Sequence, residues 1–258
     1  MALPAHLIER LPQKLLKNGL VRLSSTNGLA PSDLLGESEE TALSEQLCTG
    51  DLLQGGVVEL SIAGGAALGT SLALHACRFA QQRSRELYGY VEWCAFIDPR
   101  GSLFAPGVAA LGVDLSRLLV LRPDEQSLSR VALRVVEAQV FPVVVIDTMG
   151  IPGANLEVSL ARWVQVVRRL SRAADGTEST VVLLTDQHTK RPLPLPVTQR
   201  FEITRASFQN ISVRVCRSSG GARFGHSTVN AQAVLRKPRA HSSSEVALHM
   251  KEQRTQHD

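Results

Sequence analysis

One stretch near the front of the chain has the residue types and spacing that bind phosphate. An apolar run at 57–62 leads into a turn of small residues, and an amphipathic run starts at Thr70. Strand, glycine-rich turn and helix in this order form a P-loop, whose backbone amides cradle phosphate groups. Gly64 and Gly69 have the spacing of that motif, and Ser71 stands at its hydroxyl position. Thr70 replaces the lysine of the motif, so the loop lacks the positive charge that contacts the β and γ phosphates.

Polar residues close three further apolar runs and suit the remaining chemistry of a nucleotide site. Asp147 follows the run 143–146, and its carboxylate fits either a support for Mg²⁺ through water or a cap of the following turn. Arg100 stands two residues after Asp98, where an ATPase would use an acid to orient the attacking water. Gln187 ends a third run, and its amide suits contact with a γ-phosphate as well as a strand cap.

Alternating strand and helix patterns supply the frame for these residues. Apolar runs predict strands near 57–62, 92–97, 118–121, 143–146, 181–184, 201–204 and 212–215. Amphipathic periodicity predicts helices near 70–85, 106–111, 125–138 and 156–173. This alternation indicates an α/β fold with parallel strands and right-handed crossovers. Ligands in such sheets bind at the carboxyl ends of the strands, where the turn at Gly64 would lie.

Composition bounds the class of protein. A chain of 258 residues with 44% apolar residues can bury a full core, which excludes a wholly disordered protein. No apolar run approaches the ~18 residues of a membrane span, and the first residues lack the order of a signal peptide. We therefore expect a cytoplasmic protein without membrane contact. The cysteines lie far apart, which favours packed, reduced thiols over a metal site: Cys48, Cys77, Cys94 and Cys216.

Positive charge is concentrated in the last third of the chain. The segment 186–226 holds seven Lys or Arg against two acids, although the net charge of the whole chain is only +4. Such a bias suits an anionic partner, either nucleic acid or an acidic protein face, and equally suits a solvated surface. The basic residues of this region are Lys190, Arg191, Arg200, Arg205, Arg214, Arg217 and Arg223.

The chain divides into four segments. Residues 1–25 combine a helix with an apolar face and a short alternating strand at 20–23. A helix and a lone strand cannot bury themselves, so this unit needs either the chain's own core or a neighbouring subunit. A polar linker at 26–50 leads into the α/β core at 51–236. The tail at 237–258 is Ser-rich and poor in apolar residues, which predicts disorder.

Several motifs in a fixed order resemble the bacterial recombinase RecA over roughly residues 7–230. They are GGVVELSIAGGAALGTSLALHACRFAQ, CAFIDPRG, ALGVDLSRLLVLRP, VVVIDT, SLARWVQVVRRLSRA and VVLLTDQ. The resemblance implies a RecA-like P-loop NTPase core, a mostly parallel sheet with helices on both faces. It also implies that the front unit docks on a neighbouring RecA subunit through Leu7, Leu11, Leu15, Leu20, Val21, Arg22 and Leu23.

The sequence departs from that family at the positions that drive ATP hydrolysis. The loop lysine is absent in either alignment of the loop, which places Gly69 or Thr70 opposite it. The family's catalytic glutamate corresponds to Arg100, and the loops after Asp147 and Gln187 are shorter than the DNA-binding loops of RecA. These departures imply a degenerate nucleotide site, no enzymatic activity and no bound cofactor.

A RecA-like core with this combination of losses resembles the ImuA family, the RecA-like accessory proteins of the bacterial translesion mutasome. That family works with ImuB, an inactive Y-family polymerase relative, and with an error-prone replicative-type polymerase. The resemblance implies a non-catalytic adaptor that binds RecA during SOS mutagenesis and DNA-damage tolerance. A weak contact with single-stranded DNA and assembly into homo-oligomers stay open, as does the alternative of a slow RecA-like ATPase or a DNA-binding recombination regulator.

Overall fold

Strands and helices alternate along the chain, as the sequence predicts. The computed structural model describes residues 47, 52, 55–63, 68–149, 156–187, 195–218 and 226–235. Within them the elements are β1 (Gly56–Ala63), α4 (Gly69–Tyr88), β2 (Cys94–Ile97), α5 (Ala105–Ala110), η1 (Leu115–Arg117), β3 (Leu118–Leu121), α6 (Glu125–Glu137), β4 (Val143–Asp147), α7 (Leu156–Ala174), β5 (Thr180–Asp186), β6 (Gln199–Arg205), β7 (Asn210–Ser218), β8 (His226–Asn230) and α8 (Ala231–Leu235).

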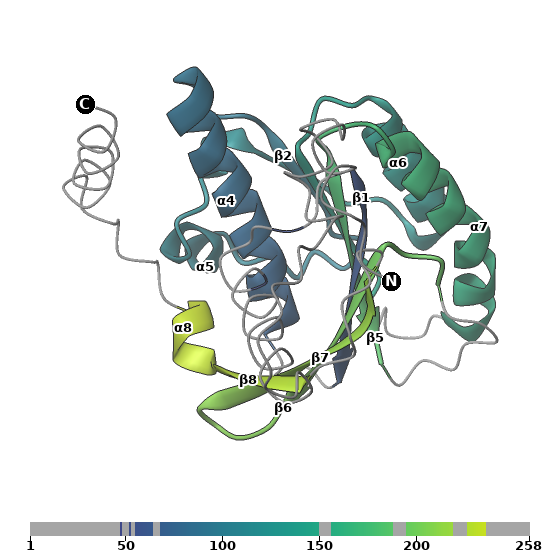
Figure 1. Ribbon diagram of the computed structural model, residues 1–258. Helices are drawn as coiled ribbons and strands as arrows, with labels where there is room; N and C mark the ends of the chain where they lie inside the picture. Colours follow the sequence, from purple (N-terminus) through teal and green to yellow (C-terminus); the bar gives the residue numbers. More distant parts are fainter. Residues whose placement is uncertain are drawn as a thin grey trace, which may run out of the picture. The chain divides into compact units, whose positions relative to one another are not determined.

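The strands form one eight-stranded sheet in the order β3-β2-β4-β5-β1-β6-β7-β8 (Figure 1). The first six strands in this order run parallel. The last two pairs, β6 with β7 and β7 with β8, are antiparallel, and a register shift interrupts the first of them between Arg200 and Phe201. The predicted α/β class with a mostly parallel sheet is therefore confirmed.

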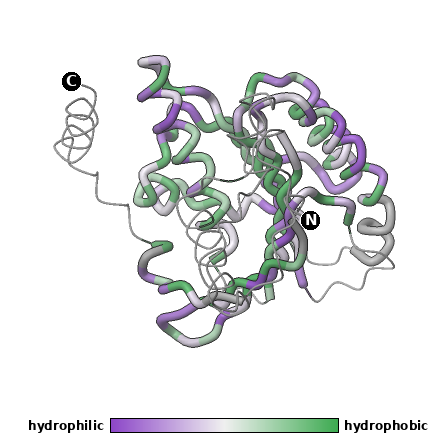
Figure 2. The backbone as a smooth tube through the Cα atoms, viewed as in Figure 1, coloured by the Kyte–Doolittle hydropathy of each residue, from purple (hydrophilic) through white to green (hydrophobic). Residues whose placement is uncertain are grey.

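Helices cover both faces of the sheet (Figure 1). On one face, buried residues of α4, α5 and α8 pack against alternate strand residues, among them Val58 and Leu60. On the other face, α6 and α7 pack against the intervening residues, among them Val57 and Val144. Apolar residues run along the central strands between these layers (Figure 2). Strands buried on both faces read as continuous apolar runs, which is why the sequence located them.

Local signals set the helix ends. The backbone N–H of Gly89, at φ 75°, donates to the carbonyl of Arg85 and closes α4. This left-handed conformation favours glycine. At the start of α6 the Asp124 carboxylate accepts a 2.7 Å bond from the backbone N–H of Ser127. Such a cap satisfies a donor that the helix itself leaves unpaired.

The second strand begins later than the sequence predicts. The apolar pattern started it at 92, whereas β2 starts at Cys94. The backbone N–H of Glu92 instead donates to Ser84 Oγ at 3.1 Å, which ties this residue to α4 rather than to the sheet. The elements β8 and α8 were not predicted, because each is only five residues long, which is too short to show a clear period.

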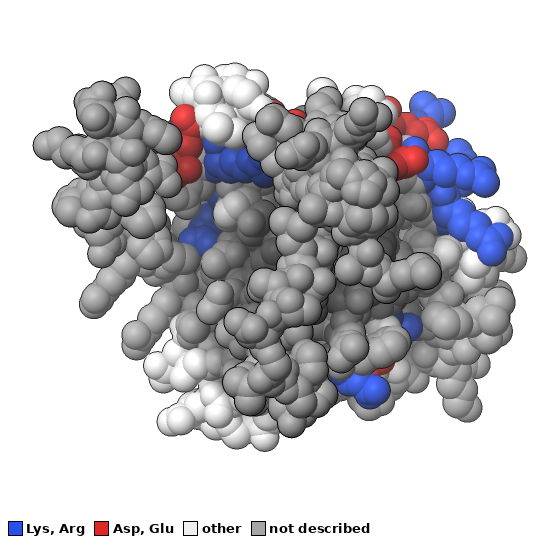
Figure 3. Space-filling view, viewed as in Figure 1, with Lys and Arg blue, Asp and Glu red and all other residues white. Residues whose placement is uncertain are grey.

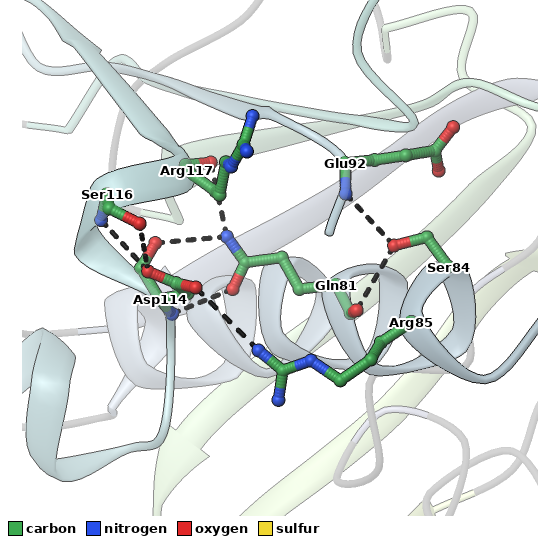
Figure 4. A network of polar contacts seen from close by, with 7 residues as sticks. All are labelled: Gln81, Ser84, Arg85, Glu92, Asp114, Ser116 and Arg117. Carbon is green, nitrogen blue, oxygen red and sulfur yellow. Dashed lines mark hydrogen bonds and ion pairs between the residues drawn. The ribbon is translucent and has the colours of Figure 1, made fainter. Parts of the chain in front are cut away.

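A polar network fastens the second half of α4 to the turn η1 (Figure 4). The Gln81 amide donates to the carbonyls of Asp114 and Arg117, and its oxygen accepts from the backbone N–H of Asp114 at 2.8 Å. Arg85 lies 3.7 Å from the Asp114 carboxylate. The Gln81 amide is thus fully used, and the long helix is fixed at this point to the segment that enters β3.

Several predicted segments lie outside the described residues. They are the front unit at 1–25, the tail at 237–258 and all of the linker at 26–50 except Leu47, which is buried. No helix among the described residues combines the length and apolar content of a membrane span.

One buried histidine joins α4 to α8. His75 is completely buried, and its Nε2–H donates to the carbonyl of Val234 at 2.5 Å. Burial has the largest effect and lowers the pKa of His75. The hydrogen bond to Val234 raises this pKa, whereas the nearby Arg78 lowers it further. The ring is therefore neutral in the folded protein near neutral pH.

We expect this neutral ring to make stability depend on pH. Below about pH 6.5 the unfolded chain protonates His75 while the folded protein resists protonation, so the free energy of unfolding falls as the pH falls. A His75→Gln variant keeps a donor for Val234 but does not titrate. Urea unfolding between pH 7.5 and 5 should show a smaller loss of stability for this variant than for the wild type. Equal losses in both proteins would contradict the prediction.

Candidate functional site

The polar residues predicted at the strand ends lie along one edge of the sheet. The strands β2, β4, β5 and β1 are parallel neighbours, and their register aligns Asp147 with Leu184 and Leu184 with Leu60. Asp98 directly follows β2, Asp147 ends β4, and Gln187 follows β5. The edge where ligands of open α/β sheets bind therefore collects three of the predicted residues.

The first residues of α4 lie at the same edge. A Cβ atom placed on Gly69 would lie 1.7 Å from Cδ1 of Ile62, so only glycine fits there without a shift of the strand residue. Leu68 precedes the helix in the left-handed conformation at φ 59° and supplies no side-chain cap. Thr70 and Ser71 occupy the first helical turn and are half-buried. Gly64 lies outside the described residues.

Lysine is missing from the part of the chain that the structure describes. All of the chain's lysines fall outside the described ranges: Lys14, Lys17, Lys190, Lys237 and Lys251. Among the described residues, therefore, no ammonium group is available to contact a phosphate at the start of α4.

The side chain of Asp98 forms its hydrogen bonds within its own turn. It is completely buried, and its two oxygens accept bonds from the backbone N–H of Ser102 at 3.1 Å, the Ser102 hydroxyl at 3.3 Å and the backbone N–H of Leu103 at 2.9 Å. Gly101, at φ 65°, completes the turn. Three donors on one carboxylate leave it little capacity for another partner.

Arg100 reaches across the edge toward β4. Its guanidinium donates to the carbonyl of Met149 at 2.9 Å, and its side chain is exposed. This contact brings the positive charge of Arg100 close to Asp147.

Asp147 is the buried acid whose ionisation is most disturbed at this edge. It is 4% exposed, and its Oδ1 accepts a 2.8 Å bond from the backbone N–H of Met149. Burial raises the pKa of Asp147 to about 6, the Met149 bond lowers it, Asp98 raises it further and Arg100 lowers it. The carboxylate is ionised at neutral pH at a cost to stability, which is common for residues kept for function.

Gln187 is held beside β1 by its backbone. Its N–H donates to the carbonyl of Ile62 at 2.9 Å, which continues the pairing of β5 with β1 beyond the last ladder residues. Thr148 makes the equivalent connection from β4, because its N–H and its hydroxyl both donate to the Leu184 carbonyl. The strand ends are thus fixed by backbone and hydroxyl contacts that do not involve the side-chain amide of Gln187.

This arrangement offers limited chemistry. Asp147 can accept a proton or a hydrogen bond, and Arg100 supplies a positive charge that does not titrate. Among the described residues, no group of His, Cys, Asp and Glu could hold a metal ion. The described part of the edge therefore combines the start of a long helix with a buried carboxylate and an exposed arginine.

The described arginines of the basic region are engaged with neighbouring groups. Arg200 lies 3.6 Å from the Glu59 carboxylate and 4.0 Å from that of Glu202, and Arg214 lies 3.8 Å from Glu202. Arg205 donates to the carbonyls of Ser207 and Phe208, residues of its own turn. Their charges are therefore partly neutralised within the fold.

Other predicted binding residues cannot be placed. Arg217 belongs to β7, but its side chain is not described. The remaining basic residues, Lys190, Arg191 and Arg223, lie outside the described residues, as do the predicted docking residues Leu7, Leu11, Leu15, Leu20, Val21, Arg22 and Leu23.

Sequence reasoning missed the buried acid Glu59 on β1. It is completely buried, and its Oε1 accepts a 2.7 Å bond from the hydroxyl of Thr185 on β5. Together with Arg200 on β6 it forms a polar chain across three neighbouring strands. The signal in the sequence was a single acid inside the apolar run VVELSI. A carboxylate buried in such a run needs hydrogen-bond or charged partners, so this residue could have been recognised as part of a polar contact.

Comparison with known proteins returns no assignment. No protein-family model matches the sequence, and no curated protein matches it either.

The elevated pKa of Asp147 predicts that its replacement stabilises the protein. In Asp147→Asn the amide oxygen still accepts from Met149, and the buried charge is gone. Because the carboxyl pKa rises from 3.8 to about 6 on folding, the gain should be roughly 1–3 kcal/mol above pH 7. It should shrink as the pH falls from 6 to 4, where the wild-type carboxyl becomes protonated. Urea unfolding at pH 8 and pH 4.5 measures this difference.

Asp98→Asn is the matched control for this prediction. The same change should destabilise the protein by roughly 1–3 kcal/mol, because Asp98 accepts three bonds that an amide cannot all replace. Destabilisation of similar size by both variants would show that Asp147 serves only as a structural acceptor.

Proposed function

We propose that this chain is a non-catalytic, RecA-like adaptor of the ImuA kind, which acts in bacterial DNA-damage tolerance and SOS mutagenesis. It binds RecA and links it to ImuB, the inactive Y-family polymerase relative, and through ImuB to an error-prone replicative-type polymerase. The observation that carries the proposal is the contact of Arg100 with the end of β4, in a described core without lysine.

The topology supports the RecA-like part of the proposal. Strand β1, which leads into the long helix α4, lies between β5 and β6 in the sheet. Beyond β6 the strands pair in the antiparallel direction. This order is compatible with a RecA-like core, and the ends of the strands β2, β4 and β5 carry the polar residues of the motifs CAFIDPRG, VVVIDT and VVLLTDQ. A fold by itself does not carry an activity, so the function has to be argued from the residues at the edge.

The residues at the edge support a core that does not hydrolyse ATP. The lysine contact to the phosphates is missing at Gly69 and Thr70, and the position of the acid that activates water is Arg100. Each such loss commonly lowers a rate by a factor of ~10²–10⁴. Arg100 also donates to Met149, so its charge lies at the end of β4.

The isolated protein should therefore hydrolyse ATP no faster than buffer. Phosphate release by the wild type, with Mg²⁺ present, should equal that of the Asp147→Asn variant. Including the variant separates genuine turnover from a contaminating ATPase. Hydrolysis that Asp147→Asn abolishes would contradict the proposal and favour the alternative of a slow RecA-like ATPase.

Docking on RecA rests on the pattern of residues 7–23. An apolar helical face followed by the alternating run 20–23 is suited to add a helix and a strand to a neighbouring subunit. Apolar side chains and backbone hydrogen bonds would form this contact. It would therefore not depend on the charge of the DNA that RecA coats.

Replacement of the docking leucines should abolish the association with RecA. A charge buried in such a contact costs several kcal/mol, so Leu20→Asp and Leu23→Asp should each weaken binding by roughly a hundredfold or more. Biolayer interferometry with immobilised RecA measures the affinities. Leu87→Asp is the control, because Leu87 is a 60% exposed leucine on α4. Unchanged binding of the Leu20 and Leu23 variants would refute docking through this unit.

Self-association is a second use of the same unit. The edge strand β3 pairs with β2 alone among the described strands, and the apolar residues Leu103, Val108 and Leu115 line a groove beside it. A strand of a second copy could pair with this edge. Sedimentation of the purified protein, with Leu20→Asp as comparison, distinguishes a homo-oligomer from a monomer that docks only on RecA.

A further inference from the structure

Five arginines gather on the outward side of α6 and α7. Arginine side chains, drawn in blue, collect at the right of the space-filling view beside some acidic side chains, drawn in red (Figure 3). All five are exposed, and we call them the arginine face: Arg130, Arg134, Arg168, Arg169 and Arg172. The signal for it in the sequence was the spacing of four residues between arginines on the polar sides of two predicted helices.

The helix geometry places these side chains on one continuous surface. Arg130 and Arg134 lie one turn apart on α6, and Arg168 and Arg172 lie one turn apart on α7. The two helices pack on the same face of the sheet. An ion pair of 3.2 Å between Arg169 and Glu137 crosses from one helix to the other.

Only part of this charge is neutralised within the protein. Arg169 pairs with Glu137, and Arg130 lies near the capping carboxylate Asp124, whose pKa is lowered mainly by bonds from Ser127 and also by this arginine. No hydrogen bond or ion pair joins Arg134, Arg168 or Arg172 to another residue in the described part of the chain. With respect to the described residues, three guanidinium groups are therefore open to an anionic partner.

The surroundings of the arginines suit a nucleic-acid backbone better than a protein. Neither α6 nor the described side chains of α7 include an exposed large hydrophobic residue. Protein interfaces usually have an apolar centre, and the described side chains of this surface include none. Trp163 is the aromatic residue of α7 and is buried, so the surface offers no ring on which an unpaired base could stack. Guanidinium groups bind phosphates in a two-pronged geometry.

We propose that the arginine face binds the phosphate backbone of duplex DNA without reading its base sequence. This inference goes beyond the adaptor function, because it concerns a surface of the core and not the docking unit. It would hold the adaptor on duplex DNA whether or not RecA is bound.

The test compares binding of a short fluorescein-labelled DNA duplex by anisotropy across a range of salt concentrations. The triple variant Arg134→Gln/Arg168→Gln/Arg172→Gln removes three exposed charges. We expect its affinity at low salt to fall at least tenfold. The slope of log K against log salt should become less steep by about 2.7, since each phosphate contact contributes about 0.9.

A matched triple variant controls for net charge. Arg83→Gln/Arg117→Gln/Arg122→Gln removes three exposed arginines of α4, η1 and the end of β3. This control should bind nearly as the wild type does. Equal losses in both triple variants, or no loss in the arginine-face variant, would overturn the proposal, as would the absence of duplex binding by the wild type at low salt.

Two competitors separate the other anionic partners. A single strand of the same length should compete more weakly than the duplex, and polyglutamate of matched charge should compete poorly. Stronger competition by the single strand, or equal competition by polyglutamate, would overturn the proposal in favour of unpaired DNA or an acidic protein. Leu20→Asp should leave duplex binding unchanged, so failure of RecA docking and failure of this proposal are observed separately.

Discussion

Burial of the central strands on both faces is the constraint on which the rest of the molecule depends. The strands β4, β5 and β1 lie between two helical layers, and nearly all their residues are buried. Parallel neighbouring strands need crossover connections, which are usually helical. The crossovers bring the carboxyl ends of the parallel strands to the same edge. Asp98, Asp147 and the start of α4 are therefore neighbours although the chain separates them widely.

Two acids at this edge differ because their surroundings differ. Asp98 accepts bonds from two backbone amides and a hydroxyl, whereas Asp147 accepts one amide bond and is otherwise desolvated. Burial without enough donors raises the pKa of Asp147, and only Arg100 brings an opposing charge near it. The backbone N–H of Met149 offsets the burial of Asp147 most, and Arg100 adds a smaller effect in the same direction.

The sequence predicted the features that depend on local patterns. Apolar runs located β1, β2, β4 and β5, and the last three of these strands end at or next to the predicted polar residues Asp98, Asp147 and Gln187. Features that depend on long-range packing were missed. Glu59 meets Thr185 and Arg200 only because three strands separated in sequence become neighbours. The elements β8 and α8 carry too little periodicity to be recognised. Ion pairs of Arg200 and Arg214 likewise follow from the register of β6 and β7, which a charge count does not contain.

The distribution of lysine in this chain bears on how its contacts can be mapped. The described core carries its positive charge on arginine, and the lysines all fall in segments outside the described residues. Amine-reactive crosslinkers and biotin esters will therefore modify those segments and leave the helical faces chemically intact. A partner trapped through a lysine of this chain must lie within reach of residues such as Lys14 or Lys251, whereas one seated on the core would need a guanidinium- or carboxyl-directed reagent.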